Sequence, residues 1–112
     1  MNNWVEGMMK ATGGYVTAWD VVNEAISGGG NDEGFYTLQS ASNVSAEDTK
    51  NNFYWQDYLG NVDYVRIVVA AARKYYAENG GTAPLKLFVN DYNLESWWDG
   101  NKKAQSLSLI HI

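Results

Sequence analysis

The chain has 112 residues, a formal net charge of -5 and a hydrophobic content of 46%, and it contains no cysteine. This length allows a single domain, and the lack of cysteine excludes a disulfide scaffold, a thiolate metal site and a catalytic thiol. The chain has eight Lys and Arg and thirteen Asp and Glu. Nucleic acid is therefore an unexpected partner, because so few basic side chains would release few counterions from its phosphates. No apolar run approaches the roughly 20 residues that span a bilayer, so no membrane span is expected, and the first residues carry no targeting signal.

The first half of the chain predicts a helix, a strand and a long connection. Residues 4–12 carry apolar side chains at helical spacing, and the glycine pair at 13–14 favours a helix end. Residues 15–22 form a short β-branched and aromatic run, which predicts a buried strand covered on both faces, as in parallel sheets. Residues 25–60 predict a connection rich in aromatic side chains, and connections of this length in compact domains are usually functional or disordered. The aromatic content argues against disorder.

The second half predicts helix, strand and helix. Residues 61–78 place an apolar stripe on one face, with Asp63 in the first turn and glycines after the end. After a short turn that contains Pro84, residues 85–90 predict a second buried strand. A further helix is expected from Leu94 onward.

The order of these elements predicts an α/β fold. Strand–helix–strand connections imply parallel strands with a right-handed crossover. The connection that leaves the first strand is long and the turn that enters the second is short, as in barrels of eight strand–helix units, whose active sites lie on the loops that leave the strands. A doubly wound open sheet would share the alternation, but its glycine fingerprint is missing after both strands.

Both predicted strands end in polar residues. Asn23 and Glu24 follow the first strand, and residues 90–93 follow the second. Because parallel strands point their carboxyl ends the same way, we expect these clusters to face one cavity, where a carboxylate is typical of a catalytic group. The alternative is that Glu24 complements a helix dipole and that Asn93 caps a helix. Position alone leaves both interpretations open.

Two motifs resemble glycoside hydrolase family 10, the endo-β-1,4-xylanases. Trp-Asp-Val-Val-Asn-Glu-Ala at 19–25 is similar to the acid/base signature of that family, and Lys-Leu-Phe-Val-Asn-Asp-Tyr-Asn at 86–93 is similar to its next strand. The resemblance covers roughly residues 4–106. It implies a fragment of a (β/α)8 TIM barrel with two parallel strands and flanking helices, in which residues 1–106 form a partial catalytic domain.

The resemblance also implies roles for single residues. Glu24 would be the general acid that protonates the leaving glycosidic oxygen and then the base that activates water. Asn23 would hydrogen-bond the 2-hydroxyl of the xylose under attack. Asn90, Tyr92 and Asn93 would line the cleft on the leaving-group side. The implied partner is xylan or xylo-oligosaccharides, with no cofactor and no metal.

The resemblance implies a longer protein, here called the parent enzyme, that lies outside the cell, in the periplasm or on the cell surface. Its retaining mechanism needs a second carboxylate as nucleophile, which in the family is a glutamate on a much later strand. Asp91 and Glu95 are candidates by residue type alone, and neither matches a family motif. The isolated chain is therefore expected to be inactive.

Two other functions stay open from the sequence. One is a related barrel glycosidase that acts on another β-glycan, such as β-glucan or mannan. The other is a non-catalytic carbohydrate-binding segment that uses Trp55, Tyr58 and Tyr92 as stacking platforms, since aromatic rings offer flat faces to sugars.

The last residues, 107–112, break from the family pattern, and we predict that they are a non-native tail. Leu-Ser-Leu-Ile-His-Ile is what ctg-tct-ctt-ata-cac-atc encodes, the end of a transposon used to build sequencing libraries. The nucleotide sequence is expected to carry these codons. Any other codons, or a homologous continuation, would contradict an adaptor origin, and in that case the segment would be an ordinary apolar end of the chain.

Overall fold

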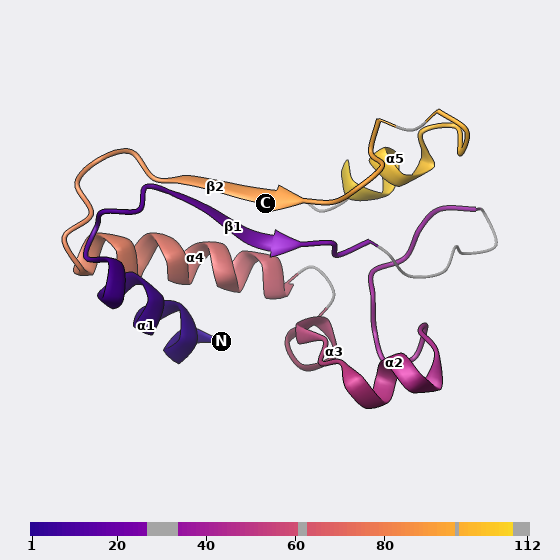
Figure 1. Ribbon diagram of the computed structural model, residues 1–112, viewed down its shortest axis with the longest axis horizontal. Coiled ribbons are helices and arrows are strands. Elements are labelled where there is room, and N and C mark those ends of the chain that lie inside the picture. The colour runs from indigo at the N-terminus through magenta and orange to yellow at the C-terminus, as the bar shows by residue number, and fades with distance from the viewer. Residues whose placement is uncertain (27–33, 61–62, 96, 109–112) are drawn as a thin grey trace. The chain divides into compact units, whose positions relative to one another are not determined.

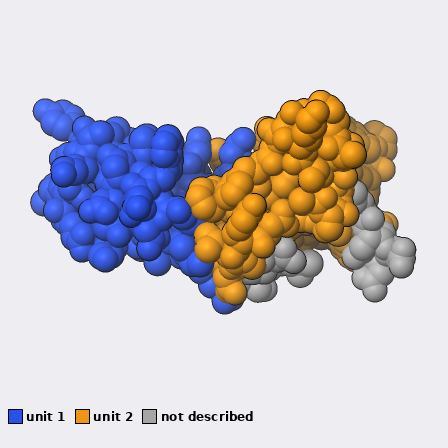
Figure 2. All heavy atoms as spheres, turned by 90° about the horizontal axis from the view of Figure 1, so that it is seen from below, with its two compact units in different colours: residues 1–23, 65–89, 112 blue, residues 24–64, 90–111 orange. Residues whose placement is uncertain are grey.

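The computed structural model describes residues 1–26, 34–60, 63–95 and 97–108. These residues form two strands and five helices (Figure 1), which in chain order are α1 (Asn2–Thr12), β1 (Ala18–Asn23), α2 (Ala46–Asn51), α3 (Trp55–Leu59), α4 (Asp63–Glu78), β2 (Lys86–Asn90) and α5 (Lys102–Ser108). The chain divides into two compact units, residues 1–23 with 65–89 and residues 24–64 with 90–111, which Figure 2 shows in blue and orange.

Strands β1 and β2 pair in a two-stranded sheet and point the same way (Figure 1). The amide of Lys86 donates to the carbonyl of Thr17 at 2.8 Å at the start of this pairing. Parallel strands need a crossover connection, and here that connection contains α4. The predicted parallel pair of strands is confirmed.

The first strand begins later than predicted, at Ala18 instead of residue 15. Gly13 ends α1 in the left-handed conformation with φ of 54°, and its amide donates to the carbonyl of Met9. The amide of Tyr15 then donates to the carbonyl of Thr12 at 3.0 Å, which continues the turn. The chain therefore uses residues 15 and 16 to leave the helix before Thr17 makes the first bond of the strand pairing.

The predicted burial of the strands on both faces is wrong within the described residues. Exposed and covered side chains alternate along β1 up to Val21, and Phe88 on β2 is 47% exposed. Helices α1 and α4 lie on one side of the sheet (Figure 1), and an apolar cavity of about 230 Å³ is lined by α1, β1 and α4. A continuous hydrophobic run allows both faces of a strand to be buried, but the burial itself depends on which neighbouring elements the fold provides.

The core of the first unit lies along α4. Val65 is fully buried, and Ala72 and Tyr76 on the same stripe are 1% and 5% exposed. The Tyr76 hydroxyl donates to the carbonyl of Ala83 at 2.8 Å, and Gly81 packs under the Tyr76 ring, where a Cβ atom would overlap it. The predicted apolar stripe of residues 61–78 is thus confirmed over its described part, which begins at residue 63.

The long connection after β1 contains two short helices that the sequence does not predict. Helix α2 begins where Ser45 Oγ accepts from the amide of Asp48 at 3.0 Å and donates to its carboxylate at 2.6 Å, a reciprocal cap. Helix α3 follows, and its Gln56 side chain donates to the carbonyl of Gln39. These side-chain contacts order the connection, whose residues 27–33 lie outside the described part.

The last helix begins at Lys102 and not at Leu94. Gly100 and Asn101 have φ of 68° and 61°, and the amide of Gly100 donates to the carbonyl of Trp97 at 3.0 Å. A helix cannot run through two successive left-handed residues, so the chain turns before α5 starts. Leu107 and Ser108 are the last residues of α5, and residues 109–112 lie outside the described part. The predicted non-native tail therefore stays a prediction.

The described helices include none that is both long enough and apolar enough to cross a membrane.

Gly14 is predicted to be essential for the turn between α1 and β1. Its φ is 83°, and a Cβ atom would lie 2.6 Å from the carbonyl oxygen of Gly80. We expect Gly14→Ala to lower the free energy of unfolding by about 2 kcal/mol or more, because it combines a left-handed backbone with a steric clash.

Gly7, in the middle of α1, provides the matched control for urea unfolding curves. A Cβ atom there meets nothing within 4 Å. Gly7→Ala should raise the free energy of unfolding by about 0.5–1 kcal/mol through helix propensity. Equal urea midpoints for wild type and Gly14→Ala would contradict the close approach of Gly14 to Gly80.

Candidate functional site

The two strands end beside each other, as predicted from their parallel pairing. The amide of Glu24 donates to the carbonyl of Asn90 at 2.8 Å. Glu24 directly follows β1, and Asn90 is the last residue of β2. One backbone bond therefore brings the predicted acid/base residue to Asn90 of the second motif.

Strand β1 carries one extra residue before this bond. Regular parallel pairing from the bond between Lys86 and Thr17 would bring the amide of Asn23 to the carbonyl of Asn90. The amide of Glu24, one residue later, donates to that carbonyl. This is a β-bulge, and bulges are frequent next to active sites because they redirect a side chain at the end of a strand.

The backbone is left-handed at two of the predicted site residues. Glu24 and Asn93 have φ of 54° and 57°. Asparagine tolerates this left-handed conformation, whereas glutamate adopts it at a cost of about 1–2 kcal/mol. Such strain persists where surrounding contacts fix the backbone, and it is concentrated at functional sites.

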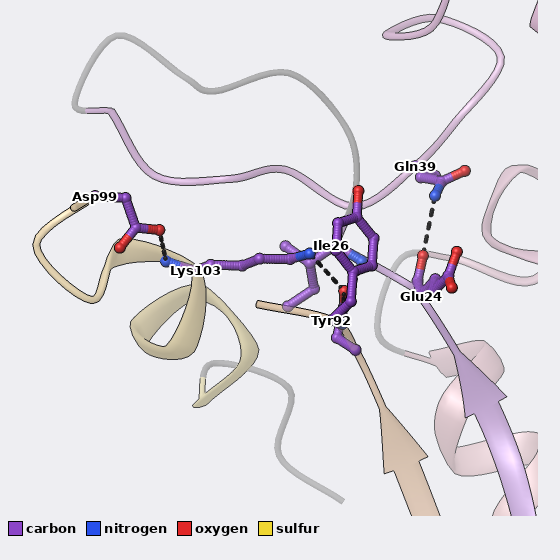
Figure 3. A network of polar contacts seen from close by, with 7 residues as sticks. Glu24, Ile26, Gln39, Tyr92, Asp99 and Lys103 are labelled. Atoms are coloured by element: carbon purple, nitrogen blue, oxygen red, sulfur yellow. Dashed lines mark hydrogen bonds and ion pairs between the residues drawn. The ribbon is translucent and has the colours of Figure 1, made fainter. Parts of the chain in front are cut away.

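Contacts on both sides of its peptide unit hold Glu24. Its carbonyl accepts from Nε2 of Gln39 at 3.0 Å (Figure 3), and the amide of Gln39 donates to the carbonyl of Ala25 at 2.9 Å. Gln39 lies in the long connection, so this segment closes back on the residues that follow β1. Glu24 itself is exposed.

The side chain of Asp91 is buried and bonded to other parts of the chain. Its side chain is 0% exposed. Oδ2 accepts from the amide of Ile26 at 2.9 Å, and Oδ1 accepts from the amide of Tyr92 at 2.9 Å. Oδ1 also pairs with Nζ of Lys103 at 2.7 Å. A carboxylate held in this way cannot approach a sugar carbon, which argues against Asp91 as nucleophile.

Lys103 is buried against Tyr92, and the sequence gives no sign of it. Its Nζ lies 3.3 Å from the centre of the Tyr92 ring, which is a cation–π contact (Figure 3). Its amide donates to Oδ2 of Asp99 at 3.2 Å at the start of α5. Lysine is almost never fully buried unless it is paired. From sequence alone, two successive lysines on a short helix are therefore predicted to be solvent-exposed.

A polar cavity of about 120 Å³ lies beside these residues. Its lining consists of Ile26, Tyr36, Tyr92, Asn93, Trp98, Asp99 and Lys103. Two predicted site residues, Tyr92 and Asn93, thus share a cavity, whereas Glu24 and Asn90 do not line it. Asn23, the last residue of β1, is exposed. The expectation that all strand-end side chains face one cavity is met only in part.

The long connection also carries an exposed aromatic cluster, formed by Phe53, Trp55 and Tyr58. The rings of Phe53 and Tyr58 stack with centroids 4.8 Å apart and an interplanar angle of 15°, and Trp55 meets Phe53 edge-on. Tyr58 is 70% exposed. This cluster contains two of the three predicted stacking residues.

The part of the chain that the structure describes contains no group of three carboxylate or imidazole side chains arranged to hold a metal ion.

A glutamate and amides at the carboxyl ends of parallel strands are typical of glycosidases built on α/β barrels. The family described as "Glycosyl hydrolase family 10" matches residues 1–111. The chain is also 32% identical over 95 residues to "Endo-1,4-beta-xylanase A" of Halalkalibacterium halodurans, an alignment that covers 85% of this chain and 18% of that protein. No solved structure matches significantly. The chain belongs to glycosyl hydrolase family 10, as its two motifs predict, and it spans less than a fifth of that relative.

Tyr64 is expected to make stability pH-dependent at high pH. Burial, and then the negative charge of Asp91, raise the pKa of its phenol to about 12. A tyrosine in an unfolded chain titrates near pH 10, so the contribution of Tyr64 to the free energy of unfolding is complete below about pH 10 and is lost as the pH rises towards 12.

Urea unfolding at about pH 9 and about pH 11.5 measures this loss, which by linkage is at most about 3 kcal/mol. Tyr64→Phe should flatten the decline between the two pH values. Tyr15→Phe is the control, because Tyr15 is 94% exposed. The prediction fails if Tyr64→Phe and Tyr15→Phe show the same decline.

Proposed function

We propose that this chain is the acid/base segment of a retaining endo-1,4-β-xylanase with a (β/α)8 barrel fold. The observation that carries the proposal is the bond between the amide of Glu24 and the carbonyl of Asn90, which joins the two family motifs. The family match and the name of the relative from Halalkalibacterium halodurans support xylan as the substrate. A polymer of this kind is met outside the cell, so we place the parent enzyme there.

The reaction assigns two successive roles to Glu24. Its carboxyl proton moves to the glycosidic oxygen while the nucleophile carboxylate attacks the anomeric carbon, and the bond from that carbon to the leaving sugar breaks. The Glu24 carboxylate then takes a proton from water, whose oxygen bonds to the anomeric carbon and releases the nucleophile. The bulge and left-handed backbone at Glu24 support this role because they fix the direction in which its side chain leaves the strand.

The neighbouring polar residues bind the sugar. Asn23 would hydrogen-bond the 2-hydroxyl at the reacting ring, since an amide both donates and accepts without competing for the proton. Asn90, Tyr92 and Asn93 would line the leaving-group side. Tyr92 is 49% exposed, which leaves room for a sugar against it.

The nucleophile belongs, in this proposal, to another part of the parent enzyme. A retaining mechanism needs two carboxyl groups about 5–5.5 Å apart. Asp91 is ruled out as the partner of Glu24 by its buried contacts, and Glu95 matches no family motif. A barrel typically needs about 250 residues, more than twice this chain. We therefore propose that the 112 residues alone do not hydrolyse xylan.

A second candidate function rests on the aromatic cluster of Phe53, Trp55 and Tyr58. Exposed, stacked rings suit a non-catalytic carbohydrate-binding surface. Xylan affinity that persists in Glu24→Ala, together with a parent protein that has no hydrolytic activity, would favour this function. A substrate panel that includes β-glucan and mannan separates xylanase activity from activity on another β-glycan.

Glu24→Gln in the parent enzyme tests the main proposal. The amide cannot give a proton, so kcat/KM on xylan should fall by about 10²–10⁴-fold. Glu6→Gln, an exposed glutamate on α1, is the matched control and should leave activity within about twofold. Release of xylo-oligosaccharides is the measurement. Unchanged activity of Glu24→Gln would overturn the assignment, and so would xylan hydrolysis by the isolated chain that depends on Glu24.

A further inference from the structure

Lys103 carries a buried positive charge that the proposed reaction does not use. Its side chain is 5% exposed, and that of its partner Asp91 is 0% exposed. Taking two charges out of water is costly unless each finds close partners. Nζ meets this requirement with Asp91 Oδ1 at 2.7 Å and the centre of the Tyr92 ring at 3.3 Å. Such an arrangement must therefore be held by a specific local structure.

The contacts of Asp91 reach both segments that carry the proposed site. Oδ2 accepts from the amide of Ile26, two residues after Glu24, and Oδ1 accepts from the amide of Tyr92. One carboxylate thus joins the segment after β1 to the segment after β2. Lys103 enters from a third element, α5, where its own amide is bonded to Asp99 (Figure 3).

We propose that Lys103 is a positioning residue for the leaving-group side of the site. Its ammonium pairs with Asp91 Oδ1 and holds the carboxylate where it accepts from both backbone amides, and it fixes the plane of the Tyr92 ring from one face. Lys103 touches no reacting atom. The inference rests on the proposed function, because it assumes that Glu24 protonates a leaving sugar that lies against Tyr92.

Loss of the charge has a definite chemical consequence. Without Lys103, Asp91 is a buried carboxylate with no cation, a costly state that is relieved when the carboxylate moves towards water. This movement breaks its hydrogen bonds to the Ile26 and Tyr92 amides. The segment that follows Glu24 is then held less tightly, and the Tyr92 ring loses the contact that fixes it.

A residue that only stabilises the fold would behave differently. It would lower the number of active molecules and so reduce the rates on all substrates by one factor. A positioning residue on the leaving-group side affects a substrate whose leaving sugar needs protonation and contact with Tyr92. Loss of such a residue should hardly change the rate on a substrate whose leaving group departs without a proton and places no sugar against Tyr92.

The test compares two substrates in the parent enzyme, with rates expressed per active site by burst titration. Xylopentaose needs the acid and the leaving-group side, whereas dinitrophenyl β-xylobioside needs neither. In Lys103→Met, kcat/KM for xylopentaose is expected to fall by about 10–100-fold, and that for the dinitrophenyl substrate by about threefold at most. Lys103→Arg, which keeps the charge, should restore most of the loss. Lys10→Met, the same change at an exposed lysine on α1, is the matched control and should stay near wild type.

Hydrogen–deuterium exchange supplies a readout that does not depend on activity. In Lys103→Met, exchange at the Ile26 and Tyr92 amides should speed up by about tenfold or more, because each loses a charged acceptor, while Val69 in the core of α4 stays protected. If Val69 loses protection as well, the variant has unfolded, and Lys103→Gln takes its place with the same expectation. Glutamine can still donate to Asp91 but carries no charge.

The outcomes separate this inference from the proposed function. Unchanged exchange at Ile26 and Tyr92, or equal losses on the two substrates, would overturn the role of Lys103 while leaving Glu24 as acid/base. A wild-type parent that hydrolyses neither substrate would remove the proposed function, and with it the positioning role, even where exchange shows that Lys103 holds the two segments. Selective loss on xylopentaose with faster exchange supports both.

Discussion

The carboxylate of Asp91 is the contact on which the arrangement of the candidate site depends. Strand pairing brings Glu24 and Asn90 together through one backbone bond. Beyond the strands, Asp91 joins the two segments with two bonds to backbone amides and an ion pair to Lys103. Because the group is buried, these contacts are made in a medium of low dielectric, where a paired charge is held firmly and an unpaired one is costly.

The same constraint explains why the strained backbone persists. A glutamate in the left-handed region is unfavourable by itself, so neighbouring contacts must fix it. The Glu24 amide is bonded to Asn90, its carbonyl to Gln39, and the Ile26 amide to Asp91. These three bonds come from different parts of the second unit. Together they hold a bulged strand end in the geometry that the proposed proton transfer needs.

The two units differ in what stabilises them. In the first, apolar side chains of α4 such as Val65 and Ala72 form the core, and hydrophobic burial is the main term. In the second, much of the order comes from capped short helices and side-chain bonds to backbone, as at Ser45 and Gln56. Loops that carry functional residues commonly depend on such polar contacts, because they must present side chains to solvent and cannot bury them in a core.

The sequence alone determined the class of fold, the order of the main elements and the family. Apolar periodicity marks helix 61–78, and the motifs at 19–25 and 86–93 identify glycosyl hydrolase family 10, because these signals lie in contiguous residues. It could not reveal the two helices in the connection, the late start of α5 or the half-exposed strands, which depend on left-handed residues, caps and neighbours. Only the tertiary structure decided that Asp91 is a structural carboxylate and that Lys103 is buried, because their partners are distant in the chain and charge alone favours an exposed residue.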